Sequence, residues 1–211
     1  MEIIWLGHSC FRLTENGFTL VIDPYYHRDV MGYPALKLTA EMVLCSHEHY
    51  GHNYREAVTL RPYQVPNPFE IETIESSHDV LQGRLRGPNT VHIIRAGGLK
   101  IIHLGDLGCA LTPEQEGQIS DADALMTPVG GILTIDAAQA HFLCERVRPR
   151  VILPMHFGGN GLGNRRLHPP EEFTGFYEPD FIRLYDAPLA LGKDTPPQVA
   201  MFSLACAAQS V

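Results

Sequence analysis

The sequence lacks the long apolar run that a membrane-spanning helix needs. No stretch of its 211 residues approaches the roughly 20 consecutive apolar positions required to cross a bilayer. The segment from Met1 to Trp5 also lacks the basic start and long apolar stretch of a secretory signal. We therefore expect a cytoplasmic protein with no membrane partner.

Basic blocks are missing as well. The chain has 16 lysines and arginines against 24 aspartates and glutamates, a formal net charge of −8. This balance argues against broad binding to a phosphate backbone, so we expect no nucleic-acid partner. With 45% apolar and 19% charged residues, the chain can bury a sizeable core, which excludes disordered and fibrous classes.

Paired cysteines are the third absence. The five cysteines are scattered, odd in number and never spaced as Cys-x-x-Cys. A disulfide framework or a cysteine zinc site would need closer, paired spacing. We therefore expect reduced cysteines that are mostly buried as small apolar residues.

Repeats and flexible linkers are also absent, so residues 1–211 are predicted to form a single domain. Short apolar or alternating runs predict strands over residues 2–6, 10–14, 18–23, 42–45, 69–76, 90–95, 99–104, 124–126 and 151–153. Helices are predicted over residues 137–147 after an Asp136 cap, 113–119 after a Thr112 cap, 52–58 and 170–174. Strands followed by alternating helices and strands favour an α/β (α+β) αββα sandwich of two mixed sheets with outer helices over a barrel or a Rossmann sheet.

What the sequence does have is histidine, 11 in all, with a cluster in residues 46–52. His47 and His49 are two apart, so on extended chain they point the same way. His52 joins them if a helical turn begins there. Neutral imidazoles at this spacing suit zinc or a similar divalent ion, and the alternative is a His-rich surface loop. The zinc-protease pattern His-Glu-x-x-His is not met, because Gly51 stands at its second histidine.

Further polar residues follow predicted strands at their ends. His78 and Asp79 follow residues 69–76, Asp106 follows residues 99–104 and His156 follows residues 151–153. Each alone is more typical of a local structural role. Together they predict a site at the strand ends, in which Asp106 is suited to bridge two cations.

Seven motifs in order carry a resemblance to a known family. They are residues 5–9 (Trp-Leu-Gly-His-Ser), 22–24, 46–52, 87–90, 103–108, 128–131 and 154–156. With these the sequence resembles the metallo-β-lactamase-fold metal hydrolases, in particular the branch similar to L-ascorbate-6-phosphate lactonase. The resemblance implies an αββα sandwich with one or two divalent metals at one edge, most often zinc, with manganese and iron as alternatives.

The resemblance also implies roles for individual residues. By this likeness, His47, His49 and His78 hold a first metal, Asp106 bridges, and His52 and His156 hold a second. Asp23 would hold the His-rich segment of residues 46–52 in position without binding the metal itself.

One position departs from the family pattern, because Gly51 stands where an aspartate normally binds the second metal. Three consequences are open. The second metal is weakened or lost, His8 or Glu48 replaces the aspartate, or the site binds metal and turns over poorly.

The chemistry expected is that of a metal-dependent hydrolase whose activated water attacks a small ester, lactone or phosphate-bearing substrate. Asp106 would hold the metal and orient the water, and Asp79 is either a supporting base or a surface residue. Arg165, Arg166 and His168 either hold an anionic substrate or form solvated surface. A non-catalytic metal-binding protein is the alternative, a nuclease is disfavoured by the charge, and the oligomeric state, a homo-oligomer included, stays open.

Overall fold

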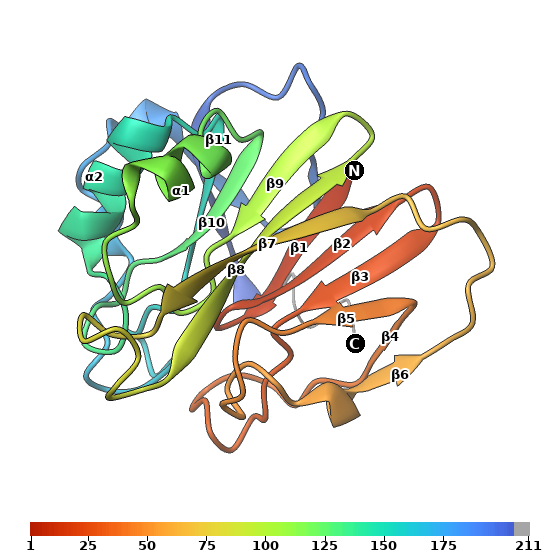
Figure 1. Cartoon of the computed structure of the whole chain (residues 1–211), viewed down its shortest axis with the longest axis horizontal. Coiled ribbons are helices and arrows are strands. Elements are labelled where there is room, and N and C mark those ends of the chain that lie inside the picture. The colour runs from red at the N-terminus through yellow and green to blue at the C-terminus, as the bar shows by residue number, and fades with distance from the viewer. Residues whose placement is uncertain (205–211) are drawn as a thin grey trace.

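The computed structural model describes residues 1–204, and nearly all of its strands fall into two sheets (Figure 1). The smaller sheet contains β1 (Glu2–Gly7), β2 (Cys10–Glu15), β3 (Phe18–Ile22), β5 (Met42–Leu44) and β13 (Leu189–Ala190). The larger sheet contains β7 (Glu70–Ser77), β8 (Pro88–Ala96), β9 (Leu99–His103), β10 (Ala124–Pro128), β11 (Val151–Met155), β12 (Ile182–Tyr185) and β14 (Gln198–Phe202). A separate ribbon pairs β4 (Leu38–Ala40) with β6 (Val58–Leu60). The helices are α1 (Pro113–Ile119), α2 (Ala137–Val147) and α3 (Glu171–Thr174), with 3₁₀ turns at Arg55–Ala57 and Pro179–Phe181.

Both sheets are mixed. The smaller has the order β13-β1-β2-β3-β5 and is antiparallel except for the β3–β5 pair. The larger has the order β12-β14-β11-β10-β9-β8-β7, parallel from β12 to β9 and antiparallel beyond. Helix α2 packs on β10, and α1 and α3 pack on α2, on the left in Figure 1. The predicted αββα sandwich of two mixed sheets is confirmed.

The central strands are apolar on both faces, as strands covered on both sides require. All five residues of β10 and of β11 are buried, and β1 is buried from Ile3 to Gly7. Fully buried side chains come from both sheets, with Phe11 and Leu20 in the smaller and Ile93 in the larger. These strands form a rigid frame, and the polar residues of interest stand at their ends.

Local signals fix several connections as predicted. The hairpin β8–β9 turns at Gly97 and Gly98, whose φ angles of 58° and 74° fit the two-residue turn that glycine favours. Helix α2 begins with a capping box between Asp136 and Gln139, and α1 has one at Thr112. The predicted helices over residues 113–119 and 137–147 are therefore confirmed with their caps.

The predicted helix over residues 52–58 is wrong. Only Arg55–Ala57 forms a 3₁₀ turn, and Val58 begins β6, where it pairs with Leu38 of β4. Pairing with a distant strand outweighs the weak local preference for helix. Short strands β4, β6 and β12 to β14 were not predicted, because they carry no long alternating pattern.

The four described cysteines are free, two buried (Cys10 and Cys144) and two half-buried (Cys45 and Cys109), while Cys206 lies outside the described residues. None of the helices within residues 1–204 combines the length and apolar character needed to span a membrane.

Candidate metal centre

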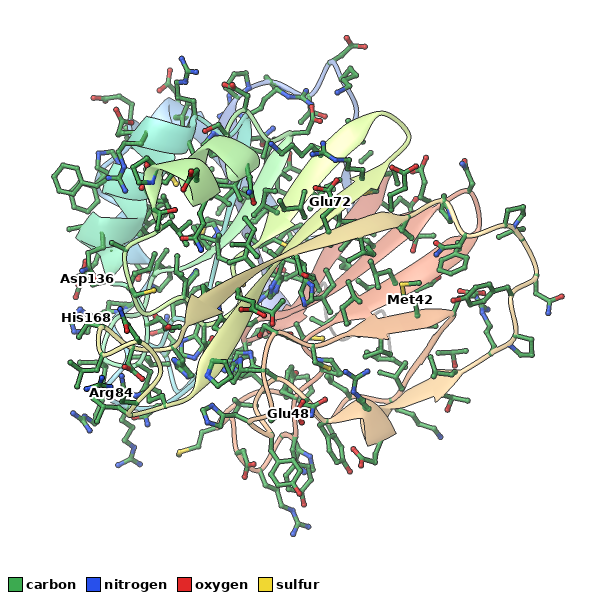
Figure 2. The ribbon with its side chains drawn as sticks, viewed as in Figure 1. Met42, Glu48, Glu72, Arg84, Asp136 and His168 are labelled. Carbon is green, nitrogen blue, oxygen red and sulfur yellow. The ribbon has the colours of Figure 1, made fainter. Side chains whose placement is uncertain are left out.

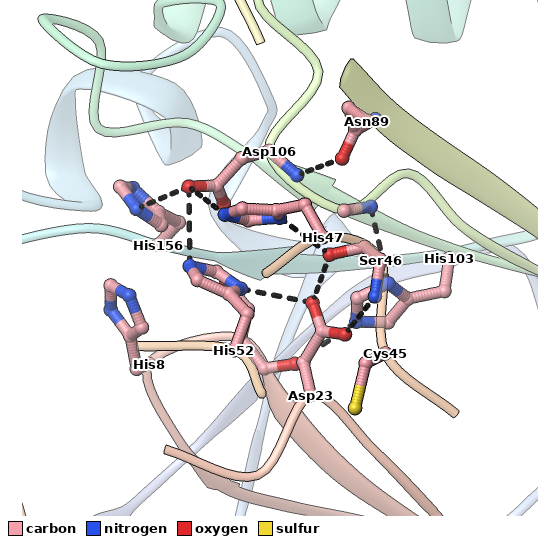
Figure 3. A network of polar contacts seen from close by, with 12 residues as sticks. His8, Asp23, Cys45, Ser46, His47, His52, Asn89, His103, Asp106 and His156 are labelled. Carbon is pink, nitrogen blue, oxygen red and sulfur yellow. Dashed lines mark hydrogen bonds and ion pairs between the residues drawn. The ribbon is translucent and has the colours of Figure 1, made fainter. Parts of the chain in front are cut away.

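Histidines and one aspartate from five chain segments meet at one edge of the sandwich (Figure 3). His8 follows β1, His47, His49 and His52 follow β5, His78 follows β7, Asp106 follows β9 and His156 follows β11. A tight turn, with the backbone N–H of His52 donating to the carbonyl of His49 (2.8 Å), brings His52 back to the others without a helix. All of these side chains are buried except His49, which is exposed.

Asp106 is the centre of the cluster. Its Oδ2 lies 3.1 Å from Nε2 of His52, 3.2 Å from Nε2 of both His78 and His156, and 3.8 Å from Nε2 of His47. One carboxylate oxygen therefore faces four imidazole nitrogens, the arrangement expected of a carboxylate shared between two cation sites.

Asp23, at the end of β3, fixes two of these rings. Its carboxylate accepts from the Ser46 backbone N–H (2.7 Å), the Ser46 hydroxyl (2.6 Å) and Nδ1 of His52 (2.9 Å). Since the Ser46 hydroxyl gives its only proton to Asp23, its oxygen accepts from Nδ1 of His47 (2.9 Å). Nδ1 of His47 and Nδ1 of His52 therefore each carry a proton, and Nε2 of both rings is directed toward Asp106.

These contacts allow a test of whether a cation fits. Within residues 1–204, Nε2 of His47 and Oδ1 of Asp106 are buried without a hydrogen-bond partner, an expensive state for polar atoms. Nε2 of His52 lies 3.1 Å from the Asp106 carboxylate, so a positive charge, either a proton on that nitrogen or a metal ion, must lie between the two atoms. Neutral imidazoles with one carboxylate are donors that zinc, manganese and iron accept. The residues present fit a divalent metal.

The charges of the side chains agree with this reading. Burial, reinforced by His52, lowers the pKa of His47 to about 3, and burial also lowers the pKa of His78. Although burial alone would raise it, His156 and His52 hold the pKa of Asp106 well below its usual value. Burial opposes charge on His52, but Asp106 and Asp23 raise its pKa to about 10 in the metal-free protein. A positive charge is therefore favoured beside Asp106, whether a proton or a metal supplies it.

Ring nitrogens and carboxylate oxygens group into three overlapping sets, each with its atoms within 4.8 Å of one another. The first set is His47, His49 and His78, and the second is His47, His52 and Asp106. The third is His8, His52 and His156. The structure therefore brings together every residue predicted as a metal ligand, and His8 with them.

Asn89 of β8 holds the loop that carries Asp106. Its side-chain oxygen accepts from the Asp106 backbone N–H (2.8 Å), and its amide donates to Leu104 (2.9 Å) and Ser76 (2.8 Å). A Cβ on Gly105 would lie 2.3 Å from this Asn89 oxygen, and its φ of 57° is left-handed, so glycine is required there. Sequence reasoning gave no role to Asn89 or Ser46, whose only signal was their place within the family motifs.

Three site residues adopt left-handed backbone that non-glycine residues rarely take. The φ angles are 51° at His8, 49° at Asp23 and 52° at His156. Such conformations cost about 1–3 kcal/mol each and persist where the surrounding structure enforces them, often at functional sites. Each of the three directs a site side chain at the end of a strand.

Asp79 does not join the cluster, although it follows His78. Its carboxylate accepts from the backbone N–H groups of Leu81, Gly83, Leu85 and Arg86, at 2.8–3.2 Å. These bonds give Asp79 a role in holding its own loop in place of the supporting base considered from the sequence.

Other sequence candidates also have local partners. Glu48 is exposed and accepts from Asn53, and Figure 2 shows it on the outside of the molecule. His168 pairs with Glu172 at 2.8 Å. The buried His103 donates from Nε2 to the Ser9 carbonyl (2.9 Å) and accepts at Nδ1 from Gly105 (3.1 Å). None of these three contributes an atom to the donor sets.

The donor atoms line a pocket of about 160 Å³. Six of its lining residues belong to the cluster: His8, His49, His52, His78, Asp106 and His156. The other six are Asp29, Val30, Gly51, Leu133, Asn164 and Leu167. A larger pocket of about 270 Å³ lies between α2 and the segment from Leu107 to Leu111, but no histidine or acidic residue lines it. Of these two pockets, the first combines a cavity with the His and Asp side chains that bind metals.

Comparison with known families agrees with this geometry. The family described as the β-lactamase superfamily domain matches residues 2–156, most of the chain. The chain belongs to this superfamily. The matched segment runs from β1 to His156 and so contains every predicted metal ligand.

Relatives in the superfamily are named as metal-dependent hydrolases. A UPF0173 protein of Pyrococcus furiosus is 28% identical, covering 82% of this chain and 89% of its own. A UPF0173 metal-dependent hydrolase of Symbiobacterium thermophilum is 27% identical, covering 75% and 84%. The crystal structure of a candidate zinc-dependent hydrolase of the metallo-β-lactamase superfamily from Thermotoga maritima aligns with a TM-score of 0.74 and 29% identity, covering 95% and 97%. A metallo hydrolase of Ignicoccus hospitalis, at 20% identity and a TM-score of 0.57 over 83% and 89%, shares the fold.

Proposed function

We propose that this protein is a metal-dependent hydrolase acting on a small ester, lactone or phosphate-bearing molecule, with zinc as its metal. The observation that carries the proposal is the first donor set, the nitrogens of His47, His49 and His78 within 4.8 Å of one another beside the Asp106 carboxylate. A divalent cation held by such donors supplies an activated water at neutral pH and stabilises negative charge on the substrate oxygen.

The chain's own residues prepare this chemistry. His47 and His78 are neutral, as ligands must be, and Ser46 holds the His47 ring in the required tautomer. The ionised Asp106 carboxylate balances positive charge and can orient a water through its buried Oδ1, which has no hydrogen-bond partner among the described residues. His49 is the exposed member of the set and lines the pocket.

The surroundings favour a small, anionic substrate. The pocket of about 160 Å³ is below the roughly 300–1,000 Å³ typical of sites for drug-sized ligands. Arg165 and Arg166 are exposed and stand between two pocket residues, Asn164 and Leu167, and neither forms an ion pair among residues 1–204. Free guanidinium groups bind carboxylate or phosphate by charge-assisted hydrogen bonds. The resemblance to L-ascorbate-6-phosphate lactonase supports a lactone or phosphate-bearing substrate in particular.

The test is hydrolysis of a small panel by zinc-loaded protein, with an aryl ester, a γ-lactone, an aryl phosphate and an aryl phosphodiester as substrates. We expect turnover of at least one, a loss of more than about 100-fold in His47→Ala, and little change in His141→Ala, a histidine on α2 outside the pocket. Stoichiometric metal without turnover across the panel would instead support a metal-binding protein. Cleavage of the phosphodiester alone would favour a nuclease.

A second measurement separates the anionic substrate from a neutral one. The double variant Arg165→Ala/Arg166→Ala should raise KM for a phosphate-bearing substrate about tenfold and leave KM for a neutral ester unchanged. Arg183→Ala, an exposed arginine on β12, is the control. Equal changes in KM for both substrates would show that the two arginines do not bind the anionic group of the substrate.

A further inference from the structure

We infer that His8 takes the place of the aspartate that position 51 lacks, so that His8, His52, His156 and Asp106 form a second metal site made mainly of imidazoles. This inference rests on the proposed function and extends it to a donor set in which a neutral ring replaces a carboxylate.

The His8 ring lies in the space beside Gly51, where an aspartate at position 51 would place its side chain. A Cβ built on Gly51 would contact Nε2 of His8 at 3.6 Å and its Cδ2 at 3.9 Å. These are ordinary contacts, so a methyl group fits, and the His8 ring already occupies the space next to that Cβ. Gly51 is not among the residues with positive φ, so its backbone does not demand glycine. The glycine instead leaves room for the imidazole.

The turn between β1 and β2 holds His8 in this position. The His8 carbonyl accepts from Nε1 of Trp5 (2.8 Å) and from the backbone N–H of His156 (3.2 Å). These bonds tie the turn to the end of β11, which carries another member of the proposed site. The His8 backbone is left-handed, with φ of 51°, as noted above.

The His8 ring has the surroundings of a ligand. It is 5% exposed, and its Nδ1 is buried with no hydrogen-bond partner in the part of the chain that the structure describes. Its ring centre lies 4.3 Å from that of His156 and 4.9 Å from that of His52, and ring nitrogens of the three lie within 4.8 Å of one another. In Figure 3 the three rings lie around one space, and the Asp106 carboxylate is 3.1–3.2 Å from two of them, His52 and His156.

Glu48 is the other candidate to replace the missing aspartate, and it belongs to none of the three donor sets. Its carboxylate is exposed and accepts from the Asn53 amide. His8 is therefore the side chain that stands in for the aspartate.

The exchange has a chemical consequence. A site with three imidazoles and a shared carboxylate has one negative charge fewer than a site in which an aspartate takes the place of the His8 imidazole. Imidazole donors suit zinc, whereas carboxylate oxygens suit manganese. The second site should therefore prefer zinc over manganese more strongly than an aspartate-containing site does.

The experiment measures metal per chain in purified protein after saturation with zinc and removal of free metal. His8→Asn is the main variant, because asparagine tolerates left-handed backbone while its short side chain cannot replace the ring. We expect two zinc ions in the wild type and one in His8→Asn, with two retained in His141→Ala. Circular dichroism checks that each variant is folded.

The double variant His8→Asn/Gly51→Asp makes the test independent of any damage to the turn. With the ring removed, aspartate can occupy the vacated space, so the second ion should return, and manganese should now bind there better relative to zinc. Gly51→Asp alone should not raise the metal content.

The results that would overturn this inference are distinct from the result that would overturn the proposed function. One ion in the wild type, unchanged in His8→Asn, would overturn the second site and leave the first intact. Two ions in His8→Asn with unaltered affinity would show that His8 is not a ligand. Absence of bound zinc in the wild type would instead remove the proposed function itself.

Discussion

At the scale of single residues, the site depends on which nitrogen of each imidazole is free. Asp23 decides this for His52 directly and for His47 through the Ser46 hydroxyl. A buried carboxylate with three donors around it is therefore as important to the site as the ligands in front of it.

Asp23→Asn tests this dependence. An asparagine amide brings its own N–H groups against one of these donors, so we expect the His52 or Ser46 contact to be lost. Affinity for zinc should fall about 10–100-fold, measured by competition with a coloured chelator. Asp121→Asn, in an exposed aspartate that pairs with Arg148, should leave the affinity unchanged. Equal affinities in Asp23→Asn and wild type would show that the hydrogen bonds do not set the tautomers.

At the scale of elements, the loop from His78 to Gly87 shows how one carboxylate organises a segment. Asp79 accepts four backbone N–H groups within this loop, which carries the exposed Arg84 (Figure 2). The loop begins directly after a metal ligand and stands beside the pocket, since Arg86 donates to the carbonyl of Ile132 (3.1 Å) next to the pocket residue Leu133.

We expect Asp79→Ala to loosen this loop because four donors lose their acceptor. Trypsin should then cut after Arg84 and Arg86 faster than in the wild type, with zinc affinity reduced less than tenfold, since no ligand is removed. Limited proteolysis followed by mass spectrometry locates the cuts, and Asp180→Ala, in an exposed turn, is the control. If Asp79 acts as a base, activity would vanish while the cutting pattern stayed that of the wild type.

The same scale shows what the sequence could predict. The spacing of His47 and His49 predicted that these two side chains act together, and the strand-end rule predicted His78, Asp106 and His156. Residues 46–49 form bends, however, in place of the extended chain on which the spacing argument relied. Asn89 could not be found this way, because its role arises only when β8 lies beside the loop after β9. Residues 52–58 were predicted as helix because the local sequence preference carries no information about the pairing of β4 with β6. The sequence left His8 and Glu48 open as replacements for the missing aspartate, and the structure places the His8 ring, 43 residues earlier in the chain, beside Gly51.

At the scale of the whole molecule, buried carboxylates link stability to pH. Glu41 accepts from the Thr19 backbone N–H (2.8 Å) and from Arg61, which ties the start of β5 to β3. Burial alone would raise its pKa, but the Arg61 and Thr19 hydrogen bonds lower it below the ordinary value of 4.5. A carboxyl with a lowered folded-state pKa stabilises the protein above the unfolded pKa and loses that contribution as the pH falls through the folded value.

Glu41→Gln should therefore reduce the free energy of unfolding by about 1–3 kcal/mol at pH 7, and the difference from wild type should shrink below about pH 4. Urea denaturation of the metal-free proteins at pH 7 and pH 3.5 measures both values. Glu72→Gln, in an exposed pair with Arg95, should cost at most about 0.5 kcal/mol at either pH. A Glu41→Gln difference of the same size at both pH values would contradict the assignment.

The central claim is that side chains from five segments gather around a divalent cation, and metal analysis of the purified protein tests it most directly. Elemental analysis of wild-type protein and His47→Ala, after dialysis against metal-free buffer, gives the number of ions per chain. We expect zinc in stoichiometric amount in the wild type, two ions if His8 completes the second site, and at least one ion fewer in His47→Ala. Wild-type protein that retains no stoichiometric metal after zinc loading, or His47→Ala that retains as much as wild type, would contradict the account.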